Sequence, residues 1–194
     1  MKKFSKLSSR VVPINIENVD TDQIIPARFL KAVERKGFGT NLFRDWRYDK
    51  EGNLIEDFPL NMKKYSGSIL VAAKNFGSGS SREHAAWAIY DYGFNVVVSS
   101  FFADIFKNNA LNNGLLPIQV STSFLSYIFT SVSENPEIEI DIDLPQQTIR
   151  CLEREESFSI DGYKKECLIM GYDDVDYLLS LKPTIEDFES RKNH

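Results

Sequence analysis

Two serines and an arginine stand together in a short stretch of the chain that contains two glycines. Residues 75–84 read Asn-Phe-Gly-Ser-Gly-Ser-Ser-Arg-Glu-His, and an apolar helix-forming segment follows. Ser80, Ser81 and Arg82 are therefore expected where a helix begins. The backbone amides and the dipole at such an end bind carboxylate or phosphate, and Arg82 adds a planar set of donors suited to a carboxylate. This stretch, the serine loop, predicts anion binding.

The same spacing supports a simpler interpretation. Ser80 and Glu83 stand three residues apart, as in a capping box, where serine and glutamate side chains bond each other's backbone amides. On residue chemistry alone, capping and anion binding are equally well supported. In the anion-binding case, Gly77 and Gly79 would let a ligand approach the backbone.

Familiar catalytic loops do not account for the serine loop. A dinucleotide fingerprint would need glycine in place of Arg82, and a nucleotide-binding loop would need Gly-Lys-Ser/Thr. A serine triad would have to use His84 or His194, the only two histidines. Because His84 belongs to the same helix as the serines, we expect it to be structural.

A second polar group, Asp20-Thr21-Asp22, follows a short strand expected at residues 10–16, with Pro13 indicating a sheet edge. An extended backbone would send both carboxylates the same way, whereas a turn would use an aspartate to satisfy local amides. The residues alone favour the turn. A short helix over residues 24–33 and a flexible, basic loop over residues 34–39 come next. Candidate carboxylate holders in and around them are Arg28, Arg35, Lys36 and Arg44.

The elements that must position these side chains alternate between strand and helix. Apolar runs at 67–73, 95–99 and 115–120 predict strands, and residues 85–90 and 102–112 predict the helices between them. This order predicts an α/β fold with a mostly parallel central sheet. We expect Phe101, Phe102 and Phe106 to lie in the core.

The last third of the chain predicts a different arrangement. Residues 137–143 alternate between acidic residues and isoleucine, as in a half-buried strand with a solvated acidic face. Strands at 148–152 and 158–160 would complete an antiparallel meander. Helices are expected at 164–170 and 174–181, followed by a frayed tail. We expect one domain over residues 1–194, with a C-terminal helical appendage from about residue 163.

Composition limits the classes of function. The 194 residues carry 23 basic and 28 acidic side chains, a net charge of -5, which offers no broad footprint for nucleic acid or an anionic membrane. No apolar run or signal peptide indicates a membrane or secreted protein, so the cytoplasm is expected. Cys151 and Cys167 are the only cysteines, too few for a zinc site or an iron-sulfur cluster, and a disulfide between them is not expected.

Residues 79–86, Gly-Ser-Ser-Arg-Glu-His-Ala-Ala, resemble the serine loop of the swivelling domain of the aconitase superfamily. Nearly the whole chain resembles the small subunits of bacterial 3-isopropylmalate dehydratases. The resemblance extends over further segments: residues 18–26, 37–39, 45–47, 102–106 and 112–117. It implies the swivelling β/β/α fold.

The resemblance implies a hydro-lyase that isomerises 2-isopropylmalate to 3-isopropylmalate through 2-isopropylmaleate in leucine biosynthesis. It implies Ser80 as the base, Asp22 in the catalytic site, and Arg82, the amides near Ser81 and Arg35 as holders of a dicarboxylate substrate. A serine is a poor base unless amides and a cation stabilise its alkoxide, as a helix start does. This chain would bind no cofactor, and a [4Fe-4S] cluster on a separate large subunit would accept the departing hydroxyl.

Two alternatives remain open. A sister dehydratase acting on a methylmalate, citraconate or a homoaconitate-like acid would share the carboxylate machinery, with residues 29–39 selecting the alkyl group. A noncatalytic anion-binding module would also use the helix start. Phe38, Phe43, Trp46 and Tyr48 are equally compatible with a subunit interface and with packing inside the domain.

Overall fold

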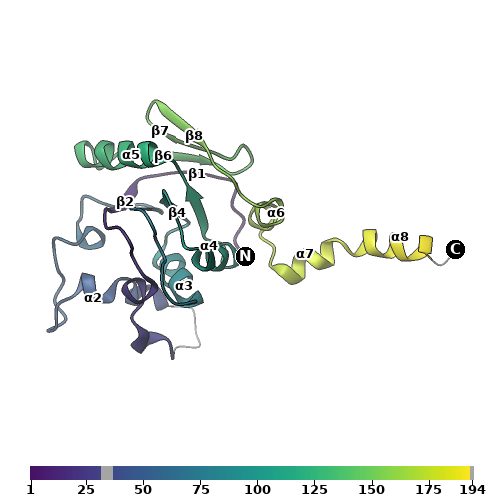
Figure 1. Cartoon of the computed structure of the whole chain (residues 1–194), viewed down its shortest axis with the longest axis horizontal. Helices are drawn as coiled ribbons and strands as arrows, with labels where there is room; N and C mark the ends of the chain where they lie inside the picture. The colour runs from purple at the N-terminus through teal and green to yellow at the C-terminus, as the bar shows by residue number, and fades with distance from the viewer. Residues whose placement is uncertain (32–36, 193–194) are drawn as a thin grey trace.

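The computed structural model describes residues 1–31 and 37–192 and has a layered α/β body (Figure 1). The parallel sheet has the order β2-β3-β4-β5, formed by Val11–Ile14, Ile69–Ala72, Val96–Ser99 and Leu116–Gln119. Every residue of β3 and β4 is buried, because both faces of this sheet are covered. The expected alternation of strands and helices is confirmed, and Pro13 lies in an edge strand.

Helices cover one face of the parallel sheet. Helix α3 (Glu83–Tyr92) follows β3 and ends at Gly93, whose φ of 119° places it in the left-handed region. Helix α4 (Asp104–Asn112) follows β4. Phe102 and Phe106 are buried against this layer as expected. The prediction was wrong for Phe101, which is 45% exposed because it lies in the connection before the helix.

The other face of the parallel sheet packs against a second, antiparallel sheet and helix α5 (Thr122–Glu134). The order of this sheet is β1-β6-β7-β8, formed by Lys6–Ser9, Ile140–Asp143, Thr148–Cys151 and Arg154–Ser157. The meander and the buried isoleucine face of β6 are confirmed. The third strand was predicted at 158–160 and lies earlier, because the chain turns directly after Cys151. Helix α5 and strand β1 were not predicted.

Short helices occupy the segment between β2 and β3. They are α1 (Thr21–Ile24), η1 (Ala27–Phe29), η2 (Phe38–Asn41), α2 (Arg44–Arg47) and η3 (Pro59–Asn61). The helix predicted over residues 24–33 was wrong in its bounds over the described part of that range: α1 begins three residues earlier, at Thr21 after its cap Asp20, and ends before Pro26. Residues 32 and 33 of the prediction, and residues 34–36 of the predicted basic loop, lie outside the described residues. Phe38 and Phe43 are buried inside the domain, so their aromatic side chains serve packing and are not available to a subunit interface.

The chain ends in three helices, α6 (Gly162–Met170), α7 (Asp174–Ser180) and α8 (Lys182–Lys192). Helix α6 lies against the body, where Phe4 N donates to Leu168 O at 2.9 Å. Helices α7 and α8 project away from the body, in yellow in Figure 1. The frayed tail expected after residue 181 was wrong, because α8 continues to residue 192.

Candidate functional site

Two segments that follow neighbouring strands form the candidate site. Thr21 N donates to Ser78 O at 2.9 Å, and Gly77 N donates to Val19 O at 2.8 Å. The segment after β2 is thereby bonded along the serine loop after β3. Both segments leave the carboxyl ends of parallel strands, the edge at which α/β sheets bind ligands.

Glycine is favoured at positions 77 and 79 of the serine loop for different physical reasons. Gly77 has φ of 77°, and a Cβ there would lie 2.2 Å from Cγ of the buried Phe106. Packing against α4 therefore requires a glycine at this position, and ligand access is not needed to explain it. Gly79 has φ of 91°, but its nearest neighbour would be Asp20 Cβ at 3.5 Å, so only its backbone conformation favours glycine.

An ion pair joins the two segments. Nη1 of Arg82 contacts Oδ1 of Asp22, with the arginine side chain 16% exposed and the aspartate side chain 56% exposed. Asp20 does what the turn prediction required: it caps α1 by accepting from Gln23 N at 2.8 Å. Asp22 is thus the carboxylate that reaches the serine loop, and Arg82 is held at the start of α3.

Ser80 is exposed and does not cap the helix. Helix α3 has Arg82 as its N-cap, with no hydrogen bond from a capping side chain, so the capping-box prediction was wrong. Glu83 is turned away from Ser80 by a long-range contact: it accepts a hydrogen bond from Asn113 Nδ2 at 3.0 Å. Within α3 it also accepts one from Trp87 Nε1 at 3.2 Å.

The backbone of Ser80 is fixed although its side chain is exposed. Thr21 Oγ1 donates to Ser80 O at 3.0 Å, and Arg82 N donates to the same carbonyl at 2.8 Å. Ser81, the next residue, is also exposed. The arrangement therefore presents two hydroxyls and a restrained guanidinium at one helix start, where a carboxylate is favoured.

His84 packs between aromatic rings behind the serine loop. Its ring centroid lies 5.6 Å from that of Phe38 and 4.4 Å from that of Trp87. Close to it, Gly39 N donates to Asp91 Oδ2 at 2.8 Å, and a Cβ on Gly39 would lie 2.3 Å from Tyr92 N. These contacts agree with the structural role expected for His84, and they fix η2 against α3.

The arginines predicted as candidate carboxylate holders differ in what the structure shows of them. Arg35, the predicted holder of a second carboxylate, lies outside the described residues. Arg28 donates from Nη1 to Asp45 Oδ2 at 2.9 Å, and this contact lowers the pKa of Asp45 and raises that of Arg28. The guanidinium carbon of Arg44 lies 3.7 Å from the ring centroid of Tyr48. Arg28 and Arg44 are thus engaged locally.

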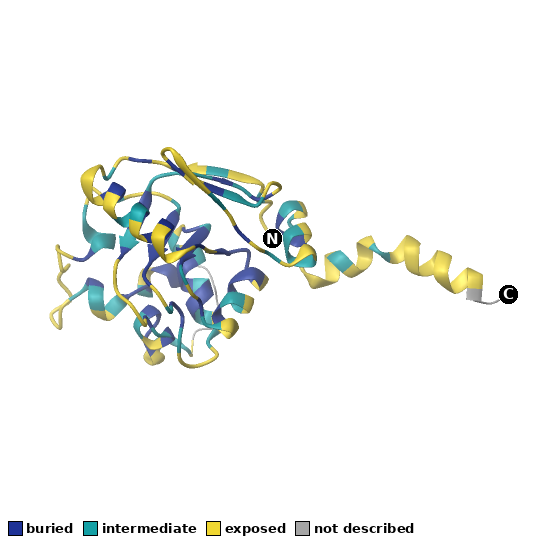
Figure 2. Ribbon diagram, turned by 45° about the horizontal axis from the view of Figure 1, so that its top comes forward, coloured by how far each residue is buried: buried dark blue, intermediate teal, exposed yellow. Residues whose placement is uncertain are grey.

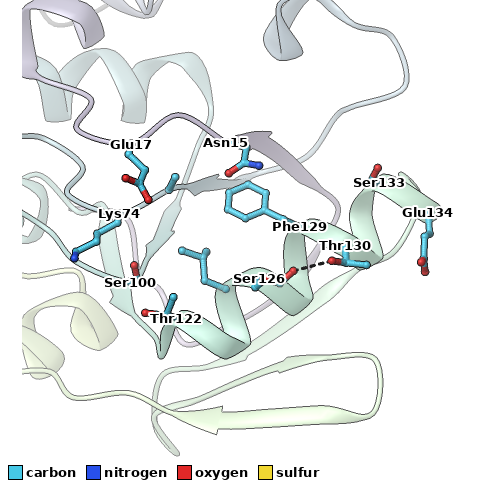
Figure 3. A pocket seen from close by; sticks show the side chains of 12 residues that line it. Asn15, Glu17, Lys74, Ser100, Thr122, Ser126, Phe129, Thr130, Ser133 and Glu134 are labelled. Atoms are coloured by element: carbon cyan, nitrogen blue, oxygen red, sulfur yellow. Dashed lines mark hydrogen bonds between the residues drawn. The ribbon is translucent and has the colours of Figure 1, made fainter.

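A pocket that was not expected from the sequence lies on the other side of the strand ends. About 550 Å³ in volume, it lies between the segments after β2, β3 and β4 and the side of α5 (Figure 3). Asn15, Lys74 and Ser100 approach it from the strand ends, and Ser126 and Phe129 from α5. None of the predicted site residues lines it.

The described residues do not fit a metal centre. Among them, no three His, Cys, Asp or Glu side chains come together in a way that could hold a metal ion. Cys151 and Cys167 are both buried and unpaired, and burial raises the pKa of each thiol. Within the same described ranges, no helix combines the length and apolar character that crossing a membrane requires.

Known proteins resemble this chain over nearly its whole length. Residues 1–123 match the aconitase C-terminal domain family. The 3-isopropylmalate dehydratase small subunit of Christiangramia forsetii is 61% identical over 194 residues, which cover 99% of this chain and 95% of that protein. The protein of the same name from Azobacteroides pseudotrichonymphae is 62% identical over 192 residues, covering 97% and 98%. The crystal structure of 3-isopropylmalate dehydratase from Methanocaldococcus jannaschii aligns with a TM-score of 0.68 at 29% identity, covering 94% of this chain and 98% of that chain.

Proposed function

Because this chain belongs to the family of 3-isopropylmalate dehydratase small subunits, within the aconitase superfamily, we propose that its serine loop and residues 18–22 are its half of the active site. As a small subunit, it is one chain of a heteromeric hydro-lyase of leucine biosynthesis and has a large subunit as its partner. The complete enzyme isomerises 2-isopropylmalate to 3-isopropylmalate through 2-isopropylmaleate.

The main support for the proposed site is that the backbone of Ser80 is held in place while its side chain is exposed. Its carbonyl is fixed by Thr21 Oγ1 and Arg82 N, while its side chain is exposed and caps nothing. In the proposal, Ser80 acts as an alkoxide that takes the proton from the carbon beside a substrate carboxylate and so becomes a neutral hydroxyl, while the charge passes to the substrate. The helix start and Arg82 stabilise the alkoxide before this transfer.

Arg82 and the backbone amides near Ser81 hold a substrate carboxylate in this proposal. A guanidinium has five donors, and the ion pair with Asp22 involves only Nη1, which leaves the other donors for a substrate carboxylate. Asp22 therefore acts by orienting Arg82 and ordering the polar network. We assign a second carboxylate to Arg35, because the resemblance to the aconitase superfamily implies a substrate-binding arginine at this spacing after Asp22.

We propose that the [4Fe-4S] cluster belongs to the large subunit. The described residues do not fit such a cluster, because the two cysteines are buried and no third metal-capable side chain joins them. The cluster would supply a Lewis acid for the departing hydroxyl. We also propose a cytoplasmic location, which the two unpaired thiols support, because cysteines stay reduced there.

Reconstitution tests this function. The chain is mixed anaerobically with a cluster-loaded large subunit, and isopropylmaleate absorbance is followed with citraconate as a competing substrate and each chain alone as a control. We expect turnover only with both chains and a preference for isopropylmaleate. A preference for citraconate would identify a sister dehydratase, and no turnover with an intact matched partner would overturn the proposal.

A further inference from the structure

The last two helices form an arm that leaves the body of the protein. Tyr163 and Lys164 of α6 both contact Asp174, and the rings of Tyr163 and Tyr177 lie 4.4 Å apart, so α7 is anchored at its first turns. Leu181 keeps a right-handed helical backbone, and Ile185 N donates to its carbonyl at 3.0 Å. Helix α8 therefore continues outward from α7. We call residues 173–192 the C-terminal arm.

The arm carries large apolar side chains that are largely exposed. Exposed fractions are 64% for Val175, 61% for Leu178, 63% for Leu179, 45% for Ile185 and 61% for Phe188. Leu178, Leu181, Ile185 and Phe188 are spaced by three, four and three residues, which places them along one side of a helix. Val175 and Leu179 widen this apolar stripe, which is about 20 Å long at 1.5 Å per residue.

Packing against the rest of the protein stabilises the arm little. All residues from 182 to 191 are exposed, which Figure 2 shows as an almost wholly yellow segment beyond α6. A helix of 11 residues, the length of α8, is marginal in water without packing. Several exposed large apolar residues on such a helix mark an interaction site rather than a solvated face.

Charge argues against a second copy of this chain as the occupant. Residues 173–192 contain six acidic and three basic side chains. A parallel pair of arms would place Asp173, Asp174 and Asp176 beside the same three acids. An antiparallel pair, centred on the stripe, would place Lys182 beside its own copy. Like charges meet in both arrangements, which disfavours self-association.

We propose that the C-terminal arm docks into a groove of the large subunit, with an apolar floor and basic side chains along its edges. This inference rests on the proposed function, which supplies a partner that is always present in the working enzyme. The apolar stripe enters the groove as an amphipathic helix does, and the excess of acidic side chains faces the basic edges. The arm thus contributes affinity between subunits and no residue of the active site.

The test uses the full chain with the paired substitution Leu178→Glu and Leu179→Glu, and calorimetric titration with purified large subunit. Because both side chains are exposed, we expect an unchanged Tm for the isolated chain. The Kd for the large subunit should rise about tenfold or more. At saturating large subunit, kcat should equal that of the unsubstituted chain.

A control is Leu152→Glu, at a leucine that is 52% exposed in the turn between β7 and β8, which should leave Kd unchanged. Equal Kd values for the unsubstituted chain and the arm variant, with both active, would overturn the arm proposal and leave the proposed function standing. Failure of the unsubstituted chain to bind would overturn both. Loss of self-association in the variant, with Kd unchanged, would assign the arm to a second copy and contradict the proposal.

Discussion

Asn113, at the end of α4, donates from Nδ2 to Oε1 of Glu83, the first residue of α3, at 3.0 Å. The two residues are 30 positions apart in the sequence, and their hydrogen bond ties the start of one helix to the end of the next. Because Glu83 is turned toward α4, it does not form a capping box with Ser80. The Ser80 hydroxyl is therefore not used in capping α3.

Asn113→Ala should destabilise the protein by about 1 to 3 kcal/mol, because Asn113 is 7% exposed and donates to both Glu83 and the Asn109 carbonyl. The neighbouring Asn112 is exposed, and Asn112→Ala should change stability by less than about 0.5 kcal/mol. Urea unfolding of the isolated chain measures both. Equal effects of the two substitutions would show that the Glu83 contact contributes nothing.

Arg82→Lys should raise KM for isopropylmalate about 10- to 100-fold at saturating large subunit. Lysine keeps the charge but loses the planar donors that pair with a carboxylate, and it cannot reproduce the geometry of the contact with Asp22. Steady-state kinetics of the reconstituted enzyme provide the measurement. Arg150→Lys, on the exposed face of β7, is the control. A KM unchanged by Arg82→Lys would remove Arg82 from the substrate site.

Gly77→Ala should destabilise the protein by about 2 to 5 kcal/mol. The added Cβ would both overlap the ring of Phe106 and force alanine into a left-handed conformation. Gly79→Ala incurs only the conformational cost, about 1 to 2 kcal/mol, since the nearest atom would lie 3.5 Å away. Urea midpoints of the two variants compare these costs directly. A larger loss for Gly79→Ala would contradict the packing account.

Asp141 gives stability a pH dependence. The Ser8 hydroxyl, 2.6 Å from Oδ1, and the Arg150 guanidinium lower the pKa of Asp141. Because the pKa is lower in the folded protein than in the unfolded chain, the ionised Asp141 stabilises the fold. This stabilisation is fully present above the usual carboxyl pKa of about 4 and is lost as pH falls through the lowered pKa of the folded protein. Asp141→Asn should therefore cost less than about 1 kcal/mol at pH 7, because the pair is exposed, and progressively less as pH falls below about 4. Urea unfolding at pH 7 and at successively lower pH checks this, and a pH-independent difference would contradict it.

The parallel sheet and its first two helices were predictable because local signals agree with the tertiary structure. The apolar runs of β3, β4 and β5 are buried, and Gly93, which follows the helix-forming segment, ends α3 in a left-handed conformation. The sequence of helix α5 also carries local signals of a helix. Ser121 caps it, and Phe124, Ile128 and Val132 recur every four residues on its buried side.

The candidate site was only partly predictable. Spacing and resemblance indicated Asp22, Ser80 and Arg82, and the structure brings Asp22 and Arg82 into contact. The partners that orient the loop could not be predicted, because they lie far away in the sequence. Asn113 donates a hydrogen bond to Glu83, which then does not form a capping box with Ser80. The ring of Phe106 leaves no room for a Cβ at position 77. Such tertiary contacts override a local pattern without leaving a signal in it.

The most direct test of the proposed site is the turnover of the enzyme reconstituted with the Ser80→Ala chain. We predict a kcat about 10²- to 10⁴-fold below that of the unsubstituted chain, as expected for loss of a general base. The Kd for the large subunit and the Tm of the chain should be unchanged, because the Ser80 side chain is exposed and does not cap α3. Ser81→Ala, which keeps the backbone amide, should change kcat far less. A Ser80→Ala enzyme with nearly full kcat would contradict the central claim that Ser80 moves the proton.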